Sequence, residues 1–250
     1  MLHFRHLVSP QGSPEGSPEG LSQNWLAALL PGRCLLCDRF TGTATDLCDP
    51  CHASLPWIRW PCRQCGLPLA DAPVPLCGEC IVRPSPFQQV VAPFAFEAPA
   101  AELIRGIKFG GNLVANRVLA TLLAQEIAAR YDVLPAVILP VPLHWRRLVL
   151  RGHNQAGLIA RVLGRRLGVP IEFDGVRRVR ATRAQTGLDR AARRRNLTRA
   201  FACRTPVIDR TVAVVDDVMT TGATLTAMAH CLKRAGATEV HVWTLARTIR

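Results

Sequence analysis

The sequence has few lysines, few aromatic residues and no long apolar run, and each scarcity excludes a class of protein. Only two of its 31 basic residues are lysine, and aromatic residues make up 6% of its 250 residues. No stretch reaches the ~18 consecutive apolar residues that a membrane-spanning helix requires. The first twenty residues also lack the apolar segment of a secretory signal peptide. We therefore expect a cytoplasmic protein with no membrane span.

The N-terminal segment contains a tandem GSPEGSPEG repeat, which has too few apolar side chains to pack into a core. We predict that residues 1–22 form a disordered tail. A small Cys-rich module over residues 23–86 and a larger domain over residues 87–250 are expected to follow. The overall composition, 49% hydrophobic and 20% charged, is that of an ordinary globular chain.

The net charge of +13 comes from one block of the chain. Residues 140–210 contain 17 basic and 4 acidic residues, whereas residues 1–139 contain 10 basic and 11 acidic residues. A basic field restricted to one block favours a polyanionic partner, either a phosphate compound or a nucleic acid. The alternative is a solvated surface in a protein whose composition favours arginine.

Eight of the ten cysteines fall into four CxxC pairs, which are Cys34/Cys37, Cys48/Cys51, Cys62/Cys65 and Cys77/Cys80. A CxxC turn places two thiolates on one side of the chain, and two such turns complete a tetrahedral sulfur site for zinc. Disulfides would need an oxidising compartment, a redox CxxC would stand alone, and an iron–sulfur cluster would use other spacings. The pattern predicts two structural Zn²⁺ ions, bound by sequential or by cross-braced pairs.

Beyond the cysteines, strand patterns alternate with helix patterns. Strands are predicted near 90–96 and at 136–141, 211–215 and 239–246, and helices at 112–130, 154–168 and 224–236. This alternation predicts an α/β fold with an open, mostly parallel sheet flanked by helices. In such sheets, ligands bind outside the carboxyl ends of the strands.

The stretch TVAVVDDVMTTGATL (Thr211–Leu225) runs from an apolar strand into two carboxylates and a loop of small and hydroxyl residues. A Walker B acid would need a GxxxxGK[ST] loop, which the sequence lacks. A receiver-type acidic pair would stand early in the fold, whereas Asp216 stands close to the C-terminal end of this chain.

The phosphate-loop interpretation accounts for both halves of this stretch. Residues at a helix N-terminus present backbone N–H groups and hydroxyls to a phosphate, here Thr220, Thr221, Gly222, Ala223 and Thr224. Carboxylates repel a phosphate, so we expect them to face a donor-rich group such as a ribose diol. The stretch therefore predicts a ribose 5-phosphate ligand. The alternative is a plain strand–turn–helix with a capping Thr.

The motifs resemble those of a known family. VAVVDDVMTTGATL is similar to the phosphoribosyl pyrophosphate (PRPP) signature of type I phosphoribosyltransferases, many of which have Gly in place of Ala223. The four CxxC pairs, IRGIKFGGN, PVPLHWRRLVLRGHNQA, TRAQTGLDRAARRRNLTRAF and the PRPP motif resemble, in this order, the competence protein F (ComF/GntX) family. The resemblance extends over residues 34–250 and implies a type I phosphoribosyltransferase-like domain behind a double zinc ribbon.

The resemblance also implies roles for single residues. Asp216 and Asp217 would bind the ribose hydroxyls as the catalytic acids, and Thr220 to Thr224 would hold the 5-phosphate. Further candidates for PRPP binding are Lys108, Arg147 and Arg151, together with Arg183, Arg190, Arg193 and Asn196 on an arm that closes over PRPP. Lys108 could equally be a surface lysine. We expect the His153 ring to fill a packing slot.

The implied chemistry is displacement of pyrophosphate from the anomeric carbon of PRPP, with Mg²⁺ bound alongside PRPP. No residue identifies the acceptor. The family is also tied to the uptake of single-stranded DNA during competence. The alternative function is therefore a non-catalytic protein that handles single-stranded DNA with competence or DNA-uptake proteins.

Overall fold

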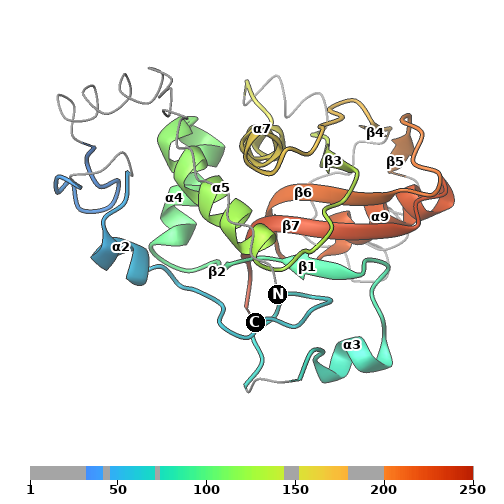
Figure 1. The fold of residues 1–250 in the computed structure, drawn as a ribbon, viewed down its shortest axis with the longest axis horizontal. Helices are drawn as coiled ribbons and strands as arrows, with labels where there is room; N and C mark the ends of the chain where they lie inside the picture. Colours follow the sequence, from blue (N-terminus) through green and yellow to red (C-terminus); the bar gives the residue numbers. More distant parts are fainter. Residues whose placement is uncertain (1–31, 42–45, 71–73, 144–151, 180–199, 250) are drawn as a thin grey trace, which may run out of the picture.

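The computed structural model describes residues 32–41, 46–70, 74–143, 152–179 and 200–249 (Figure 1). Its centre is a five-stranded parallel sheet with the order β1-β7-β6-β3, in which β2 continues the β1 side and pairs with the end of β7. The strands are β1 (Gln89–Val91), β2 (Phe94–Ala95), β3 (Val137–Pro140), β6 (Thr211–Met219) and β7 (Glu239–Arg247). The predicted fold class is confirmed.

The strands are buried on both faces, and β3 and residues 212–215 of β6 are accordingly continuous apolar runs. Along β6, Val212 and Val214 pack in the core beneath α9, whereas Ala213 and Val215 pack in the core beneath α4, α5 and α7. Four helices build these layers: α4 (Ala100–Gly110), α5 (Leu113–Ala128), α7 (Gln155–Leu167) and α9 (Ala223–Arg234). Figure 1 shows α4, α5 and α7 together on one side of the strands, and the second core places α9 against the other face.

The predicted helices form close to their predicted bounds. Asn112 caps α5, since its side-chain oxygen accepts a hydrogen bond from the Ala115 N–H at 2.9 Å. Gly168 ends α7 in the left-handed conformation at φ 69°. No helix within the described residues is long and apolar enough to cross a membrane.

Two features of the sheet differ from the prediction. The strand predicted near 90–96 is split into β1 and β2, and Pro93 lies between them without an N–H for the ladder. The strand predicted at 211–215 continues to Met219, because β7 is equally long and pairs with it as far as Arg247. The two acidic residues of the motif therefore stand within β6, close to its carboxyl end.

An antiparallel pair, β4 (Val176–Arg178) and β5 (Phe201–Cys203), forms a second small sheet that was not predicted. The segment proposed as the arm, Thr182–Asn196, falls between these two strands in the sequence and lies outside the described residues.

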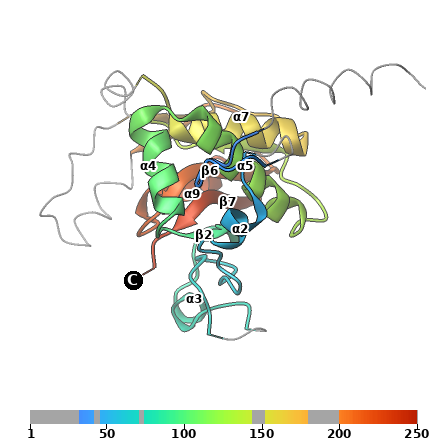
Figure 2. The same cartoon turned by 90° about the vertical axis from the view of Figure 1, so that its left-hand side faces the viewer.

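The Cys-rich module precedes the sheet and contains two short helices, α2 (Asp49–Ala53) and α3 (Gly78–Val82). Trp57 joins the module to the sheet, because its ring packs 4.6 Å from the ring of Phe94 and its backbone bridges to that residue. Figure 2 shows α2 near the helical layer, whereas α3 lies below the strands. The two halves of the module thus lie against different parts of the domain.

Candidate functional site

The acidic pair lies near the carboxyl end of β6. The Asp216 carboxylate accepts a hydrogen bond from the N–H of Asp217 at 2.9 Å, and the Asp217 carboxylate accepts one from the N–H of Val218 at 2.8 Å. Both residues are partly exposed. Burial, and then the like charge of Asp217, raise the pKa of Asp216 well above its usual range. Two adjacent carboxyl groups of this kind favour a cation or a hydroxyl donor as ligand.

Lys108 approaches this pair from the last turn of α4. Its ammonium nitrogen lies 3.8 Å from the Asp217 carboxylate, with the two side chains 35% and 15% exposed. The Gln155 side chain donates a hydrogen bond to the Lys108 carbonyl oxygen at 3.2 Å and so ties the end of α4 to the start of α7. The motif IKFGG and the acidic pair, far apart in sequence, therefore belong to one site.

The loop after β6 encloses a small hollow next to the acidic pair. The hollow measures about 40 Å³, room for a small group, and Asp216 and the residues from Val218 to Leu225 line it. Gly222 stands at φ 73° just before α9, and a side chain there would lie 2.7 Å from the Met219 terminal methyl. The first N–H groups of a helix lack partners within the helix, so this loop is suited to an anion.

A second hollow of about 370 Å³ lies on the β3 side. Its basic lining comes from Arg177, Arg178 and Arg204, and its other residues are Pro142, Leu143, Asn154, Phe173, Asp174 and Val176. The Val141 N–H donates to the Val215 carbonyl oxygen at 2.8 Å, so the chain enters this hollow directly beside the acidic pair. These three arginines were not predicted individually from the sequence, in which the basic block was only a general signal.

Six of the predicted residues, Arg147, Arg151, Arg183, Arg190, Arg193 and Asn196, lie outside the described residues. Their contribution to PRPP binding remains a prediction. His153 is described: its Nε2 atom lies 3.0 Å from the Ile107 carbonyl oxygen, so the half-buried ring ties the segment just before α7 to α4. This contact is consistent with the expected packing role.

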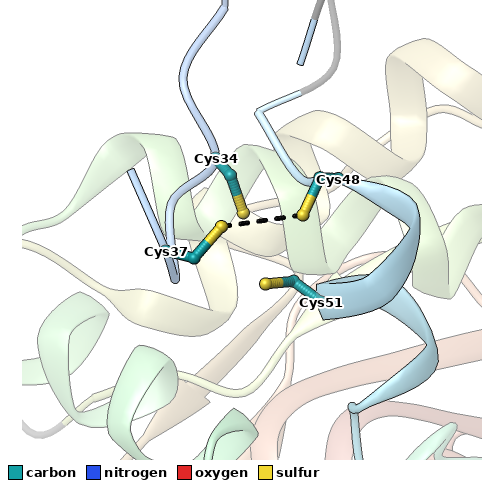
Figure 3. Close-up of side chains that lie close together, drawn as sticks. All are labelled: Cys34, Cys37, Cys48 and Cys51. Carbon is teal, nitrogen blue, oxygen red and sulfur yellow. Dashed lines mark hydrogen bonds between the residues drawn. The ribbon is translucent and has the colours of Figure 1, made fainter. Parts of the chain in front are cut away.

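The first four cysteines form one group. Figure 3 shows the sulfur atoms of Cys34, Cys37, Cys48 and Cys51 pointing toward a common centre. The Sγ atoms of Cys37 and Cys48 are 3.7 Å apart. Four sulfurs bound at about 2.3 Å to one zinc ion in a tetrahedron lie about 3.8 Å from one another. All four sulfur atoms lie within 4.8 Å of one another, so the group is suited to a single Zn²⁺ ion.

The second group repeats this geometry with Cys62, Cys65, Cys77 and Cys80. The Sγ atoms of Cys65 and Cys77 are 3.6 Å apart, again the spacing that a tetrahedral zinc site requires. Each group thus uses two CxxC motifs that follow one another, so the sequential pairing is confirmed over the cross-braced one. With four sulfur ligands, neither ion would keep a position for water, which makes both sites structural.

Hydrogen bonds from backbone N–H groups lower the thiol pKa of one cysteine in each group. Burial opposes ionisation of Cys34, but hydrogen bonds from backbone N–H groups, that of Cys48 first, lower the pKa of its thiol to about 6. Burial likewise opposes ionisation of Cys62, and N–H groups led by that of Cys77 lower the pKa of its thiol to about 7. Because zinc binds the thiolate form, each site holds one ligand close to its binding state at neutral pH.

Comparison with known proteins agrees with this geometry. Residues 25–81 match the double zinc ribbon domain, and residues 152–249 match the phosphoribosyl transferase domain. The DNA utilization protein YhgH of Escherichia coli (strain K12) is 36% identical over 88% of this chain and 99% of that protein. Competence protein F of Haemophilus influenzae is 35% identical over 86% of this chain and 96% of that protein.

Among solved structures, glutamine PRPP amidotransferase from B. subtilis is similar to the chain, with 26% sequence identity and a TM-score of 0.35. The match covers 51% of this chain and 25% of that chain.

Proposed function

Because the chain belongs to the family of competence protein F and the DNA utilization protein YhgH, we propose that it binds PRPP and transfers the phosphoribosyl group to an acceptor. In this proposal, residues 23–86 are the zinc module and residues 87–250 the phosphoribosyltransferase domain. One observation carries it: the Asp216 carboxylate and a hydroxyl-rich loop at a helix N-terminus line the same hollow, and Asp217 is the next residue.

Each part of this site has a distinct role in the proposal. Asp216 and Asp217 accept hydrogen bonds from the 2- and 3-hydroxyls of the ribose. The N–H groups and hydroxyls from Thr220 to Thr224 hold the 5-phosphate, and Gly222 allows the backbone to approach it. The raised pKa of Asp216 supports this assignment, since the pair gains most from a ligand that supplies donors or positive charge.

The leaving pyrophosphate would lie on the β3 side of the acidic pair. Arg177, Arg178 and Arg204 support this placement, because they line a hollow that begins beside β6. Mg²⁺ bound with PRPP would neutralise the charge of the leaving group, and the carboxylate oxygens of the pair are suitable ligands for it. When the acceptor attacks the anomeric carbon, positive charge grows on the sugar ring and the carboxylates stabilise it.

Titration calorimetry with PRPP and Mg²⁺ tests the proposal. We expect wild-type protein to bind PRPP in a Mg²⁺-dependent manner and the variant Asp216→Asn/Asp217→Asn to lose at least about 100-fold in affinity, about 2.7 kcal/mol. The matched control is Glu239→Gln, which neutralises a carboxylate at the opposite edge of the sheet. Equal affinity of the double variant and the wild type would end the ribose assignment.

Handling of single-stranded DNA is the second candidate function. The names of the two relatives favour it, and so does an exposed group on the zinc module. Arg59, Trp60 and Arg63 are all exposed there, Trp60 by 53%. An aromatic ring between arginines can stack on a base while the arginines contact phosphates.

The salt dependence of DNA binding separates the two functions. Each phosphate neutralised on a single strand adds roughly 0.7 to the log–log slope of affinity against salt. We expect an intermediate slope and displacement of DNA by PRPP, because the described arginines Arg177, Arg178 and Arg204 of the basic block line the hollow proposed for pyrophosphate. A steep slope that PRPP does not change would favour a separate DNA-binding function.

A further inference from the structure

Arg247 is a buried arginine that the proposed chemistry does not use. It is the last residue of β7, is only 8% exposed, and pairs in the parallel ladder with Met219, the last residue of β6. The loop proposed to hold the 5-phosphate, Thr220 to Thr224 (the PRPP loop), begins at the next residue. The guanidinium group is therefore enclosed directly beneath the proposed phosphate site.

Backbone carbonyl oxygens surround this guanidinium group. Its Nη1 atom donates to the carbonyl oxygens of Met219 at 3.0 Å, Thr248 at 2.8 Å and Thr220. On its other side, Nε donates to the carbonyl oxygen of Cys65 at 2.8 Å. One rigid, planar group thus joins the start of the PRPP loop to a zinc ligand residue that stands 182 positions earlier in the chain.

The knuckle that contains Cys65 is closely packed on the sheet. Gly66 stands at φ 69°, and a side chain there would approach the Val90 side chain of β1 to 3.0 Å. The Val90 N–H donates to the carbonyl oxygen of Arg63 at 2.8 Å, at the other side of the same turn. Zinc bound by the Cys65 sulfur would fix this turn, and with it the carbonyl oxygen that Arg247 uses.

The first zinc group contacts another part of the domain. Asp46, beside that group, forms an ion pair with Arg117 of α5. Cys34, Leu47 and Leu55 belong to the core beneath the helical layer. The chain therefore contains two sites of equal ligand geometry, one beside the PRPP loop and one beside α5.

We propose that Arg247 is a positioning residue through which zinc in the second ribbon fixes the conformation of the PRPP loop. Loss of that ion frees the Cys65 carbonyl oxygen, the guanidinium group loses one of its anchors, and the carbonyls of Met219 and Thr220 are held less firmly. The identity of the loop's ligand rests on the proposed function, but the dependence of the loop on zinc does not.

Hydrogen exchange of the backbone amides in full-length zinc-loaded protein tests this link. The matched variants are Cys77→Ser and Cys48→Ser, because each residue is half buried, precedes a short helix and belongs to a different zinc group. Elemental analysis should find one zinc ion in each variant and two in the wild type. We expect Cys77→Ser to speed exchange at residues 219–224 by about tenfold or more, and Cys48→Ser by less than about threefold.

A double-mutant cycle shows whether Arg247 transmits the effect. Arg247→Gln alone should speed exchange of the loop to a similar extent, and adding Cys77→Ser should change it little further, whereas adding Cys48→Ser should give an independent effect. If Arg247→Gln does not fold, Arg247→Lys, which keeps the charge but cannot reach both sides, takes its place. Equal effects of Cys77→Ser and Cys48→Ser, or additive effects of Cys77→Ser and Arg247→Gln, would overturn the proposal.

PRPP affinity measured on the same variants keeps the two proposals apart. We expect Cys77→Ser to weaken PRPP binding by about tenfold, in parallel with the faster exchange of the loop. If wild-type protein does not bind PRPP, the proposed function fails, and the exchange data still decide whether zinc and the loop are linked.

Discussion

Polar side chains at the amino edge of the central sheet, where the parallel strands begin, differ in their partners from those at the carboxyl edge, where the strands end. At the amino edge, the Tyr131 hydroxyl bonds to His241 Nδ1 at 2.9 Å and accepts a hydrogen bond from the Trp243 indole at 3.1 Å. His241 Nε2 in turn lies 3.1 Å from the Glu239 carboxylate. Every member of this cluster has a side-chain partner, which is typical of a structural network.

At the carboxyl edge, the two acidic groups are adjacent, and Asp216 lines a hollow. Burial and the charge of Asp217 raise the pKa of Asp216, so the ligand-free site holds these groups at a cost in stability. At the amino edge, burial raises the pKa of Tyr131 to about 12 and lowers the pKa of His241, so both stay neutral near pH 7. The comparison separates polar groups that complete a fold from polar groups that await a ligand.

The substitution Asp216→Asn should have the largest effect and should act in opposite directions on binding and on stability. The pKa of Asp216 is raised in the folded state, so the protein loses stability as the pH rises through that pKa and the group ionises. Asn does not ionise and avoids this loss. We expect the affinity for PRPP to fall by about 100-fold or more while the thermal midpoint rises, more at pH 8 than at pH 5. A lower midpoint at both pH values would show that Asp216 is structural.

Tyr131→Phe should show the reverse pattern at the other edge. Without the hydroxyl, the indole N–H of buried Trp243 and the ring of His241 lose their partner, which should cost about 1–3 kcal/mol of unfolding free energy. Urea unfolding measures the loss, and calorimetry should give an unchanged affinity for PRPP. A large loss of PRPP affinity would mean that the two edges are not independent.

The His241 network also predicts a pH dependence. Burial first lowers the pKa of His241 in the folded protein, against the opposing effect of Glu239. The folded state then binds fewer protons than the unfolded chain, so stability is complete above the unfolded pKa, near 6.5, and decreases as the pH falls through it. Urea unfolding between pH 7.5 and about 5 should show this decrease, and His241→Gln should reduce it.

Glu239→Gln should have the smallest effect. The Glu239 side chain is 46% exposed, so solvent screens its interaction with His241. We expect a change in unfolding free energy below about 1 kcal/mol, measured by the same urea titration. A larger loss would indicate that His241 is charged in the folded protein, contrary to the direction of its pKa shift.

Much of the fold follows from local patterns in the sequence. The continuous apolar run at 136–141, the Asn112 cap and the Gly168 stop each report on neighbouring residues only. The zinc ligands could be predicted because CxxC spacing is a local property. Their pairing could not, since sequential and cross-braced sites have similar spacings and the packing of the knuckles decides between them.

The features that the sequence did not reveal depend on contacts between distant segments. The short strands β4 and β5 pair although more than twenty residues separate them in the sequence. Lys108 reaches Asp217 only because α4 and β6 meet at the carboxyl edge. Arg247 reads in the sequence as one more arginine after a strand, and only its enclosure by carbonyl oxygens distinguishes it.

Hydrogen exchange of wild-type protein with and without PRPP and Mg²⁺ tests the central claim, that the carboxyl edge is the ligand site, most directly. The account predicts slower exchange at residues 216–224 in the presence of PRPP, with exchange around Tyr131 and His241 unchanged. Unchanged exchange at 216–224, or protection confined to the zinc ribbons, would contradict it.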